Sequence, residues 1–479
     1  MSWPFRKLIS AKARWETSAP IDPKGQRLIG LTLDGGEPIW APKGSSLLLG
    51  AAGSNKTTCG PMPWLYAYAA SAIGTSVLIL DSKNGEVGLQ AADMLADFGL
   101  PVAVIDDLNT WPDCRHRIKL NPFDAATSVY ERAPEELIYA LDKITLALIE
   151  EPADGDAKNR YFRAWPRLMI EFAVSVLLSR NPRLATPGGV AALLSDSDML
   201  KKFAAIEADE GDASLKVLAQ AILGMMGHEH WFQHLEAAQN ALRQFRPGTK
   251  LHDVGRGATF GHADLIRQGY FIFLVGPQAY IQELGPYYAL HLMGFLQAIY
   301  GGAGKLRIIA EEFTNAPLKT LTESLTTLRG FGAEVHMVAQ SRSEIERRFG
   351  RLGTQTIEEN SIVKQWFGFS SFDEAEKTSR AMGEELAVGS SLGADSETLR
   401  LNTNMNLVRQ RWMSPAELMA MPADQQLVHV KGLGFIVARK IGQQQIAPFC
   451  HLVAENPIEG GRLAPDPILT LTTPQRRPA

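Results

Sequence analysis

Short apolar segments alternate with helical patterns in the first quarter of the sequence. Residues 27–42 alternate apolar and polar positions around Asp34-Gly35-Gly36, which is the signature of a hairpin. Buried strands are then predicted at residues 47–49, 76–81 and 101–106, with helices from about Trp64 and over residues 87–98 between them. Strands that alternate with helices in this way form a parallel sheet covered by helices.

A long helical stretch interrupts this alternation. From about Ala133 to Arg246 the apolar positions follow helical spacing, without a convincing strand. Strands are expected again at residues 270–276, 306–313, 333–340 and 362–369, and the segments QLVHVKG and GFIVARKIG on either side of Leu433 indicate a closing hairpin. We therefore predict an α/β fold with a mostly parallel sheet into which an all-α domain is inserted.

The same pattern divides the chain into five parts. Residues 1–44 are predicted to form an N-terminal extension that includes the hairpin. The sheet domain is predicted in two pieces, 45–128 and 248–455, and the helical insertion occupies 129–247 between them. The tail 456–479 is rich in Pro and Thr, which predicts disorder.

Composition excludes several classes of protein. Of the 479 residues, 45% are hydrophobic and 21% charged, which is enough for a full-sized core. The three cysteines, Cys59, Cys114 and Cys450, argue against a disulfide framework or a cysteine zinc site and favour a reducing cytoplasm. A net charge of −4 excludes a uniformly basic nucleic-acid coat, although a local basic lining inside a ring would not show in that total. No segment reaches the ~18 to 20 continuous apolar residues of a membrane span.

A glycine-rich turn follows the first buried strand. It reads Gly50-Ala51-Ala52-Gly53-Ser54-Asn55-Lys56-Thr57 and resembles the phosphate-binding loop G-x-x-x-x-G-K-[ST]. In such a loop backbone N–H groups face the phosphates, the lysine reaches the β- and γ-phosphates, and the hydroxyl, here of Thr57, binds Mg²⁺. Asn55 stands in the place of the second glycine, and asparagine is one of the few other residues that tolerate a positive φ. The residues predicted to bind ATP are Gly50, Gly53, Ser54, Asn55, Lys56, Thr57 and Thr58; a plain strand-to-helix turn with a solvated lysine is the alternative.

Two adjacent carboxylates end a later predicted strand. Glu311 and Glu312 follow the segment LRIIA, where a nucleotide motor places one acid for Mg²⁺ and another to polarise the attacking water. Two merely solvated acids at a strand end are the alternative. Gln340 ends the next strand and is a candidate sensor of the γ-phosphate, although Ser341 after it can equally be the N-cap of a helix that needs no ligand.

Two further patterns have simpler interpretations. His230 and His234 are four residues apart on a predicted helix, but the H-E-x-x-H order of a zinc site is absent, so a surface or helix-cap role is favoured. The basic residues between 342 and 351 could line a DNA channel. Glu344 and Glu346 lie among them, however, and favour a solvated helix face.

Six segments, in order along the chain, resemble the TraG/TraD coupling proteins of type IV secretion. They are LLLGAAGSNKT, LILDSKNGE at 78–86, LNPFD at 120–124, EEF at 311–313, RGFGAEVHMVAQSRSEIERRFG at 329–350 and MSPAELMAMPADQQLVHVKG at 413–432. The resemblance spans the chain from about Leu47. It implies a RecA-like P-loop motor domain with an inserted all-α domain, assembled as a homo-hexamer, that couples ATP hydrolysis to the movement of single-stranded DNA or protein.

The resemblance also implies roles for single residues. Lys56 and Thr57 would bind phosphate and Mg²⁺, and Glu311 would support the metal. Glu312 would be the catalytic base and Gln340 would sense the γ-phosphate.

Arg329 is the candidate finger for the nucleotide of a neighbouring subunit, although it could equally end a helix and face the helix dipole. Three features depart from the family pattern. They are Asn55 in the loop, Glu311 where Asp is more usual, and one extra residue in the segment 81–86.

The function expected from the resemblance is that of a conjugation coupling ATPase. It would recruit single-stranded DNA with a relaxase, or an effector protein, and deliver this substrate to type IV secretion channel proteins. Most members of the family have N-terminal membrane spans and none is visible here, so we expect a cytoplasmic protein held at the bacterial inner membrane by a partner. Two alternatives stay open: a receptor for protein cargo with a weak nucleotide site, and a DNA translocase of the chromosome or packaging type.

Overall fold

The computed structural model of the chain describes residues 19–71, 74–151, 159–314, 319–394 and 401–474. The first 18 residues of the predicted N-terminal extension lie outside these ranges, as do the last five residues of the tail. Among the described residues the three cysteines are free, and no helix is long and apolar enough to cross a membrane.

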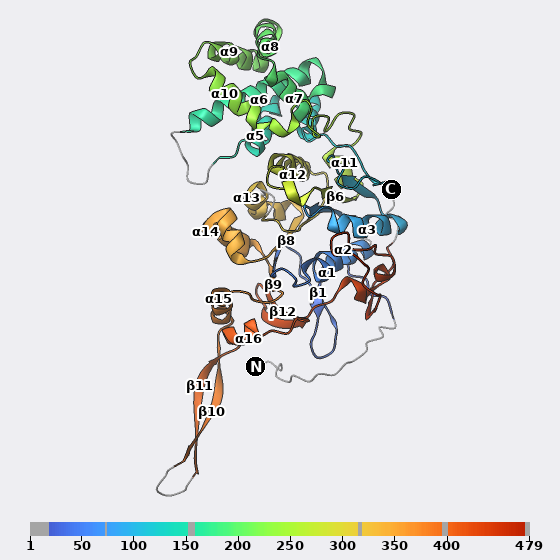
Figure 1. Cartoon of the computed structure of the whole chain (residues 1–479), viewed down its shortest axis with the longest axis vertical. Helices are drawn as coiled ribbons and strands as arrows, with labels where there is room; N and C mark the ends of the chain where they lie inside the picture. Colours follow the sequence, from blue (N-terminus) through green and yellow to red (C-terminus); the bar gives the residue numbers. More distant parts are fainter. Residues whose placement is uncertain (1–18, 72–73, 152–158, 315–318, 395–400, 475–479) are drawn as a thin grey trace.

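An 11-stranded mixed sheet runs through the centre of the molecule (Figure 1). Its order is β2-β1-β13-β12-β9-β3-β8-β7-β4-β6-β5. The strands are β1 (Leu28–Leu31), β2 (Pro38–Trp40), β3 (Ser46–Leu49), β4 (Ser76–Asp81), β5 (Val102–Ile105), β6 (Phe271–Val275), β7 (Leu306–Ala310), β8 (Ala333–Ala339), β9 (Val363–Trp366), β12 (Gln425–Val430) and β13 (Gly434–Arg439). Neighbours from β9 to β5 are parallel, whereas β12, β13, β1 and β2 extend the sheet in antiparallel pairs. The predicted mostly parallel sheet is confirmed.

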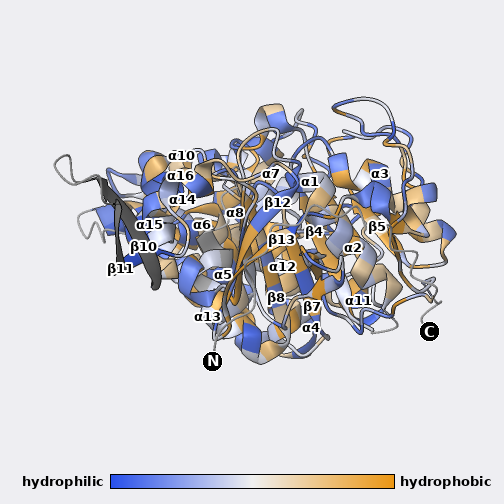
Figure 2. Ribbon diagram, turned by 90° about the horizontal axis from the view of Figure 1, so that it is seen from below, coloured by the Kyte–Doolittle hydropathy of each residue, from blue (hydrophilic) through white to orange (hydrophobic). Residues whose placement is uncertain are grey.

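Helices cover both faces of the parallel part, because successive side chains of a strand point to opposite sides. Leu47 and Leu49 of β3 belong to a buried cluster with residues of α12 (Gly285–Tyr300) and α14 (Arg342–Asn360). Leu48 belongs instead to a second cluster with α2 (Pro61–Ala70) and α3 (Glu86–Asp97). Figure 2 shows the resulting apolar strands inside a more polar shell of helices.

The helical stretch predicted between the two parts of the sheet is present. No β-strand is described between β5 and β6. The α-helices described there are α4 (Asp124–Arg132), α5 (Leu137–Leu148), α6 (Arg160–Arg180), α7 (Pro187–Ser195), α8 (Ser197–Glu210), α9 (Ala213–Met226) and α10 (Trp231–Ala241), followed by α11 (His262–Arg267). Figure 1 shows the helices α5 to α10 gathered at one end of the molecule, beyond α12. The limits 129–247 for an inserted domain stay a prediction.

A long antiparallel hairpin was not expected from the sequence. It consists of β10 (Glu384–Ala394) and β11 (Leu401–Arg411) and projects from the body of the molecule (Figure 1). Its base lies between α15 (Phe372–Met382) and α16 (Pro415–Met419), where Arg411 Nη2 donates to Glu376 Oε1 at 2.9 Å. The segment carries Gly, Ser and Asn where strands usually carry branched residues, so propensity gave no strand signal.

The C-terminal tail is ordered over the described residues, so the expectation of disorder from about Glu455 is wrong as far as Pro474. Leu469 and Thr470 form β15, which pairs in parallel with β14 (Ile446–Ala447). The side chains of Leu469 and Leu471 are 2% and 1% exposed and join the cluster beneath α2 and α3. Composition favoured disorder because the two leucines that anchor the tail stand among many Pro and Thr residues.

Replacement of Leu469 by Ala tests this docking. The change removes a buried side chain from the second cluster and should lower the free energy of unfolding by about 2 to 4 kcal/mol. Leu463→Ala, at a position that is 46% exposed, is the matched control and should change it by less than about 0.5 kcal/mol. Urea unfolding measures both, and equal effects of the two variants would show that the tail is not docked.

Candidate functional site

The predicted site residues meet at one edge of the sheet. The loop 50–55 leaves the carboxyl end of β3, Glu311 and Glu312 follow β7, and Gln340 follows β8. These strands are parallel neighbours in the order β3-β8-β7, so their carboxyl ends lie side by side. In open α/β sheets this edge is where ligands bind.

The loop after β3 has the backbone shape that its sequence requires. Asn55 has φ 62° and ψ 35°, in the left-handed region, and Gly53 has φ 75°. Asn55 therefore adopts the conformation for which a phosphate-binding loop normally uses glycine. At Gly50 the constraint is steric, because a Cβ atom there would lie 2.5 Å from Ser54 Oγ. That hydroxyl oxygen is buried and has no hydrogen-bond partner within the described structure.

Lys56 begins the short helix α1 (Lys56–Cys59), on which Thr57 and Thr58 follow. Its Nζ donates to the carbonyl oxygen of Ala51 at 3.0 Å, so the lysine side chain folds back across its own loop. Burial lowers the pKa of Lys56, and the nearby carboxylate of Glu312 partly offsets this effect. An anion beside the ammonium group would stabilise it further.

Glu311, which follows β7, lies against the loop after β3. Thr57 Oγ1 donates a short hydrogen bond to Glu311 Oε1, while the other carboxylate oxygen, Oε2, is buried and unpaired within the described residues. Burial raises the pKa of Glu311 to about 8, with a further contribution from the neighbouring carboxyls of Asp81 and Glu86. The two residues predicted to hold Mg²⁺ are therefore in contact.

The turn after β4 supplies residues that sequence reasoning did not assign to the site. Asp81 is completely buried, and its Oδ2 accepts from Gly88 N at 2.7 Å. Burial raises the pKa of Asp81 to about 7, and the nearby Glu86 adds to the effect. Lys83 Nζ lies 2.7 Å from Glu86 Oε2. Burial lowers the pKa of Lys83, but the contact with Glu86 and, to a smaller extent, the charges of Glu311 and Glu312 raise it overall. The segment LILDSKNGE carried the signal, but only as part of a family resemblance.

Glu312 and Gln340 are also brought together. Glu312 has a positive φ of 46°, an uncommon conformation for a residue with a side chain, and it is 9% exposed. Gln340 Nε2 lies 3.5 Å from Glu312 Oε1, a long contact, and Ser341 Oγ accepts from Glu344 N at 3.2 Å as the N-cap of α14. The N-cap predicted at Ser341 is confirmed. It leaves the side chain of Gln340 facing the acid, and the role of Gln340 as a sensor stays a prediction.

Arg329 does not belong to this cluster. It lies in the turn Arg329–Phe331, which precedes β8, and is exposed. Gln340 follows the other end of that strand, and seven residues at ~3.3 Å each separate the two ends by on the order of 20 Å. Arg329 therefore lies too far from Gln340 to join the same cluster.

The histidines and the basic helix make contacts of other kinds. His234 is fully buried against aromatic side chains, so the expected surface role is wrong for it, whereas His230 is the N-cap residue of α10. Within the described ranges no group of three or more His, Cys, Asp or Glu residues could hold a metal ion by itself. Arg342 is paired with Glu346 at 2.8 Å and Glu358 at 2.7 Å.

The residues at the sheet edge fit Mg-ATP. Four carboxyl groups, from Asp81, Glu86, Glu311 and Glu312, face two lysines, and Asp81 and Glu311 each keep a buried oxygen without a partner. A nucleotide-bound Mg²⁺ takes only one or two ligands from protein, the rest being phosphate and water. Thr57 and Glu311 supply such a pair, and Lys56 with the loop N–H groups suits the phosphates.

Comparisons with known proteins found one family model and several solved structures that are similar to this chain. Residues 305–423 match the family model described as the TraM recognition site of TraD and TraG. An unbound form of the bacterial conjugative coupling protein TrwBdeltaN70 gives a TM-score of 0.60 at 15% identity, over 86% of this chain and 88% of that one. The plasmid coupling protein TrwB in complex with the ATP analogue ADPNP gives 0.59 at 15% identity, over 83% and 85%. TrwB in complex with ADP and Mg²⁺ gives 0.56 at 15% identity, over the same shares.

The search of curated proteins found no match to the sequence. The structural matches show that this chain has the fold of TrwB, and the predicted fold class, an α/β fold with a mostly parallel sheet and an all-α part, is confirmed. Together with the match of residues 305–423 they confirm the resemblance to the TraG/TraD coupling proteins.

The raised pKa of Glu311 predicts that the stability of Glu311→Gln relative to the parent depends on pH. The folded state favours the neutral carboxyl, so this group destabilises the fold progressively as pH rises from about 4.5 to about 8. Glu311→Gln removes the ionisation and should be more stable relative to the parent at pH 9 than at pH 5, by on the order of 2 to 4 kcal/mol. Urea unfolding at the two pH values measures the difference, with Glu283→Gln as an exposed control. An equal effect of Glu311→Gln at both pH values would contradict a raised pKa of this buried carboxyl.

Proposed function

We propose that this TraG/TraD-type chain is an ATP-driven coupling protein that recruits single-stranded DNA, or a DNA–protein complex, and moves it to a type IV secretion channel. One observation carries the proposal: three groups lie together at the carboxyl edge of a RecA-like sheet. They are a loop that can bind phosphates, a hydroxyl–carboxyl pair that can hold Mg²⁺, and a carboxylate next to a glutamine. TrwB, which has the same fold, is bound to ADPNP in one structure and to ADP and Mg²⁺ in another.

The loop residues would hold the triphosphate. The N–H groups of the loop that includes Gly53 and Asn55 would donate to phosphate oxygens, and Lys56 would exchange its bond to the Ala51 carbonyl for the β- and γ-phosphates. Thr57 would turn its hydroxyl from Glu311 towards the metal. Bound Mg²⁺ would neutralise charge on the phosphates, and it would lower the pKa of Glu311 by placing a cation beside that carboxylate.

Glu312 and Gln340 would act on the attacking water. Glu312 lies beside Lys56 in the site and can accept a proton from water as the general base. Gln340, 3.5 Å from the same carboxylate, can orient that water and respond to the loss of the γ-phosphate through β8 and α14. The positive φ of Glu312 is backbone strain at the place where the chemistry would occur.

A ring would complete the site. Arg329 is exposed at the opposite end of β8 from Gln340, so it could contribute only to the nucleotide of a neighbouring copy, as an arginine finger in a homo-hexamer does. The match of residues 305–423 to a TraM recognition site suggests relaxosome and secretion-channel partners. Delivery to a channel places the working protein at the cytoplasmic face of the bacterial inner membrane, held there by such a partner.

Two departures of the site from the family pattern favour a second function. Asn55 replaces a loop glycine, and Glu311 replaces the shorter Asp while the pKa of its carboxyl is raised to about 8. Both changes would slow turnover without preventing substrate binding. A receptor that delivers cargo with little or no ATP hydrolysis is therefore the alternative to a motor.

Steady-state ATP hydrolysis with and without single-stranded DNA tests the motor. The parent should hydrolyse ATP faster when DNA is present, and Glu312→Gln should lower kcat by at least ~100-fold, because it removes the base without emptying the site. Glu131→Gln, at an exposed position on α4, is the matched control and should keep the parent rate. Equal rates for the parent and Glu312→Gln would reject Glu312 as the base.

Substrate binding by Lys56→Ala separates the two functions. In a motor, the affinity for single-stranded DNA should depend on nucleotide in the parent and lose that dependence in Lys56→Ala, because the lysine no longer holds the phosphates. In a receptor, both proteins should bind the substrate equally, with or without ATP. Fluorescence anisotropy of a labelled oligonucleotide measures the affinities.

A further inference from the structure

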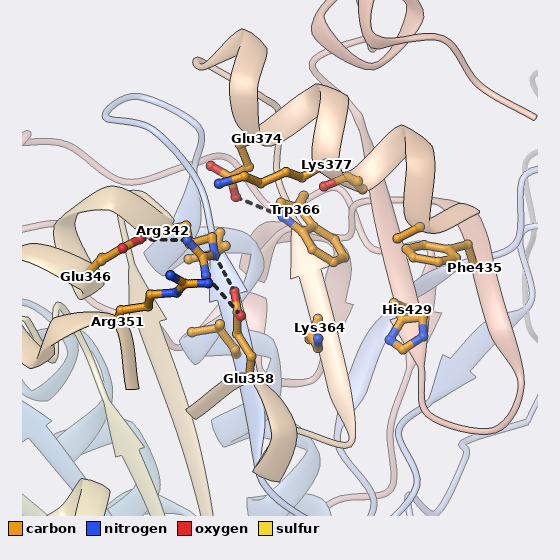
Figure 3. Close-up of a pocket in the computed structure, with 14 residues that line it drawn as sticks. Arg342, Glu346, Arg351, Glu358, Lys364, Trp366, Glu374, Lys377, His429 and Phe435 are labelled. Atoms are coloured by element: carbon orange, nitrogen blue, oxygen red, sulfur yellow. Dashed lines mark hydrogen bonds and ion pairs between the residues drawn. The ribbon is translucent and has the colours of Figure 1, made fainter. Parts of the chain in front are cut away.

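A cavity of about 620 Å³ lies outside the site described above (Figure 3). Leu47 and Leu49 line it, whereas Leu48 between them packs with α2 on the other face of the sheet. The cavity is therefore separated from α1 and α2 by the sheet. Its walls come from α14 and α15, and its size lies within the ~300 to 1,000 Å³ of small-molecule sites.

The carboxylates in this cavity already have donors. Arg342 Nε bonds Glu358 Oε1 at 2.7 Å, and Arg342 Nη1 bonds Glu346 Oε2 at 2.8 Å. The third carboxylate, of Glu374, accepts from Trp366 Nε1 at 3.1 Å. Figure 3 shows these contacts along two sides of the cavity. The acidic groups are thus occupied by the protein itself.

The remaining cations have no such partners. The cavity is lined by Lys364 of β9, Lys377 of α15 and Arg351 of α14. Within the described part of the chain, the side chains of these three residues make no hydrogen bond or ion pair. Lys364 is half-buried, and burial lowers its pKa. Glu358 lies near Lys364 and partly offsets the effect of burial on its pKa, but the carboxylate of Glu358, like that of Glu346, is already bonded by Arg342. Four cationic side chains, of Arg342, Arg351, Lys364 and Lys377, therefore share the cavity with three carboxylates, and this excess of positive charge suits an anionic ligand.

One wall of the cavity is aromatic. The rings of His429 and Phe435 have centroids 4.5 Å apart, and Trp366 lies 6.3 Å from Phe435. Phe435 and His429 lie across the cavity from Arg351 in Figure 3, with Lys364 between the two sides. An apolar planar group can pack on such rings, so the ligand that fits has a ring system at one end and an anion at the other.

We propose that this cavity binds a nucleotide, with its phosphate at Lys364, Lys377 and Arg351 and its base against Phe435 and His429. The site is distinct from the phosphate-binding loop and does not depend on the proposed motor function. The same chemistry is offered by a free mononucleotide and by one unit of a nucleic-acid strand. The experiment must therefore separate these two sources.

Calorimetric titration of the full chain carrying Lys56→Ala isolates the second site, because that change disables the loop after β3. The probes are AMP, adenosine, sodium pyrophosphate and a deoxyadenosine 12-mer. AMP should bind with one site per chain and adenosine more weakly. Binding of the 12-mer, but not of AMP, would identify a strand as the source of the nucleotide.

Three further changes in the Lys56→Ala background assign the binding to this cavity. Lys364→Met keeps the length of the side chain and removes its charge, and it should weaken AMP or 12-mer binding at least about tenfold. Phe435→Leu should also weaken nucleotide binding but leave pyrophosphate binding unchanged. Lys143→Met, on the exposed side of α5, is the control and should have no effect.

Two results would overturn the proposal. One is the absence of saturable binding of both AMP and the 12-mer to Lys56→Ala protein whose circular dichroism spectrum and melting temperature match those of the parent. The other is binding that Lys364→Met and Phe435→Leu leave unchanged, which would place the ligand elsewhere on the chain.

Discussion

The hydrogen bond from Thr57 to Glu311 joins two segments that are 254 positions apart in the sequence, and it holds together the two residues predicted to bind Mg²⁺. It can form because β3 and β7 are parallel and lie on either side of β8, so that their carboxyl ends reach the same edge of the sheet. The helical segments between β5 and β6 are accommodated without disturbing this pairing. The sheet order, more than any single motif, therefore fixes where a nucleotide can bind.

The same edge concentrates negative charge in a buried place. Asp81 and Glu311 lose hydration there, which raises the pKa of both carboxyls, and Lys83 is held by Glu86 rather than by either of them. A bound cation would relieve this cost, so stability and ligand binding are coupled through the same carboxyl groups. Lys56 contributes a positive charge to the same edge. Burial lowers the pKa of its ammonium group, and a bound anion would raise it again.

The sequence predicted the parts of the site that follow local rules. The loop after β3, the acids after β7 and the glutamine after β8 were found because each stands directly after an apolar strand. Asp81 and the pairing of Lys83 were missed, since their role depends on burial by β7 and α3, which no local pattern reveals. The hairpin of β10 and β11 and the ordered tail were missed for a related reason: their composition is that of loops, and only pairing or burial against distant residues identifies them.

The proposed function requires that a loop with Asn55 in the left-handed conformation holds a triphosphate. Calorimetric titration of Mg-ADPNP into the parent, Asn55→Gly and Asn55→Val tests it most directly. The parent and Asn55→Gly should bind with similar affinity, and Asn55→Val should bind at least ~10-fold more weakly, because a β-branched residue is strained at positive φ. No heat of binding with folded parent protein, or full affinity in Asn55→Val, would contradict the account.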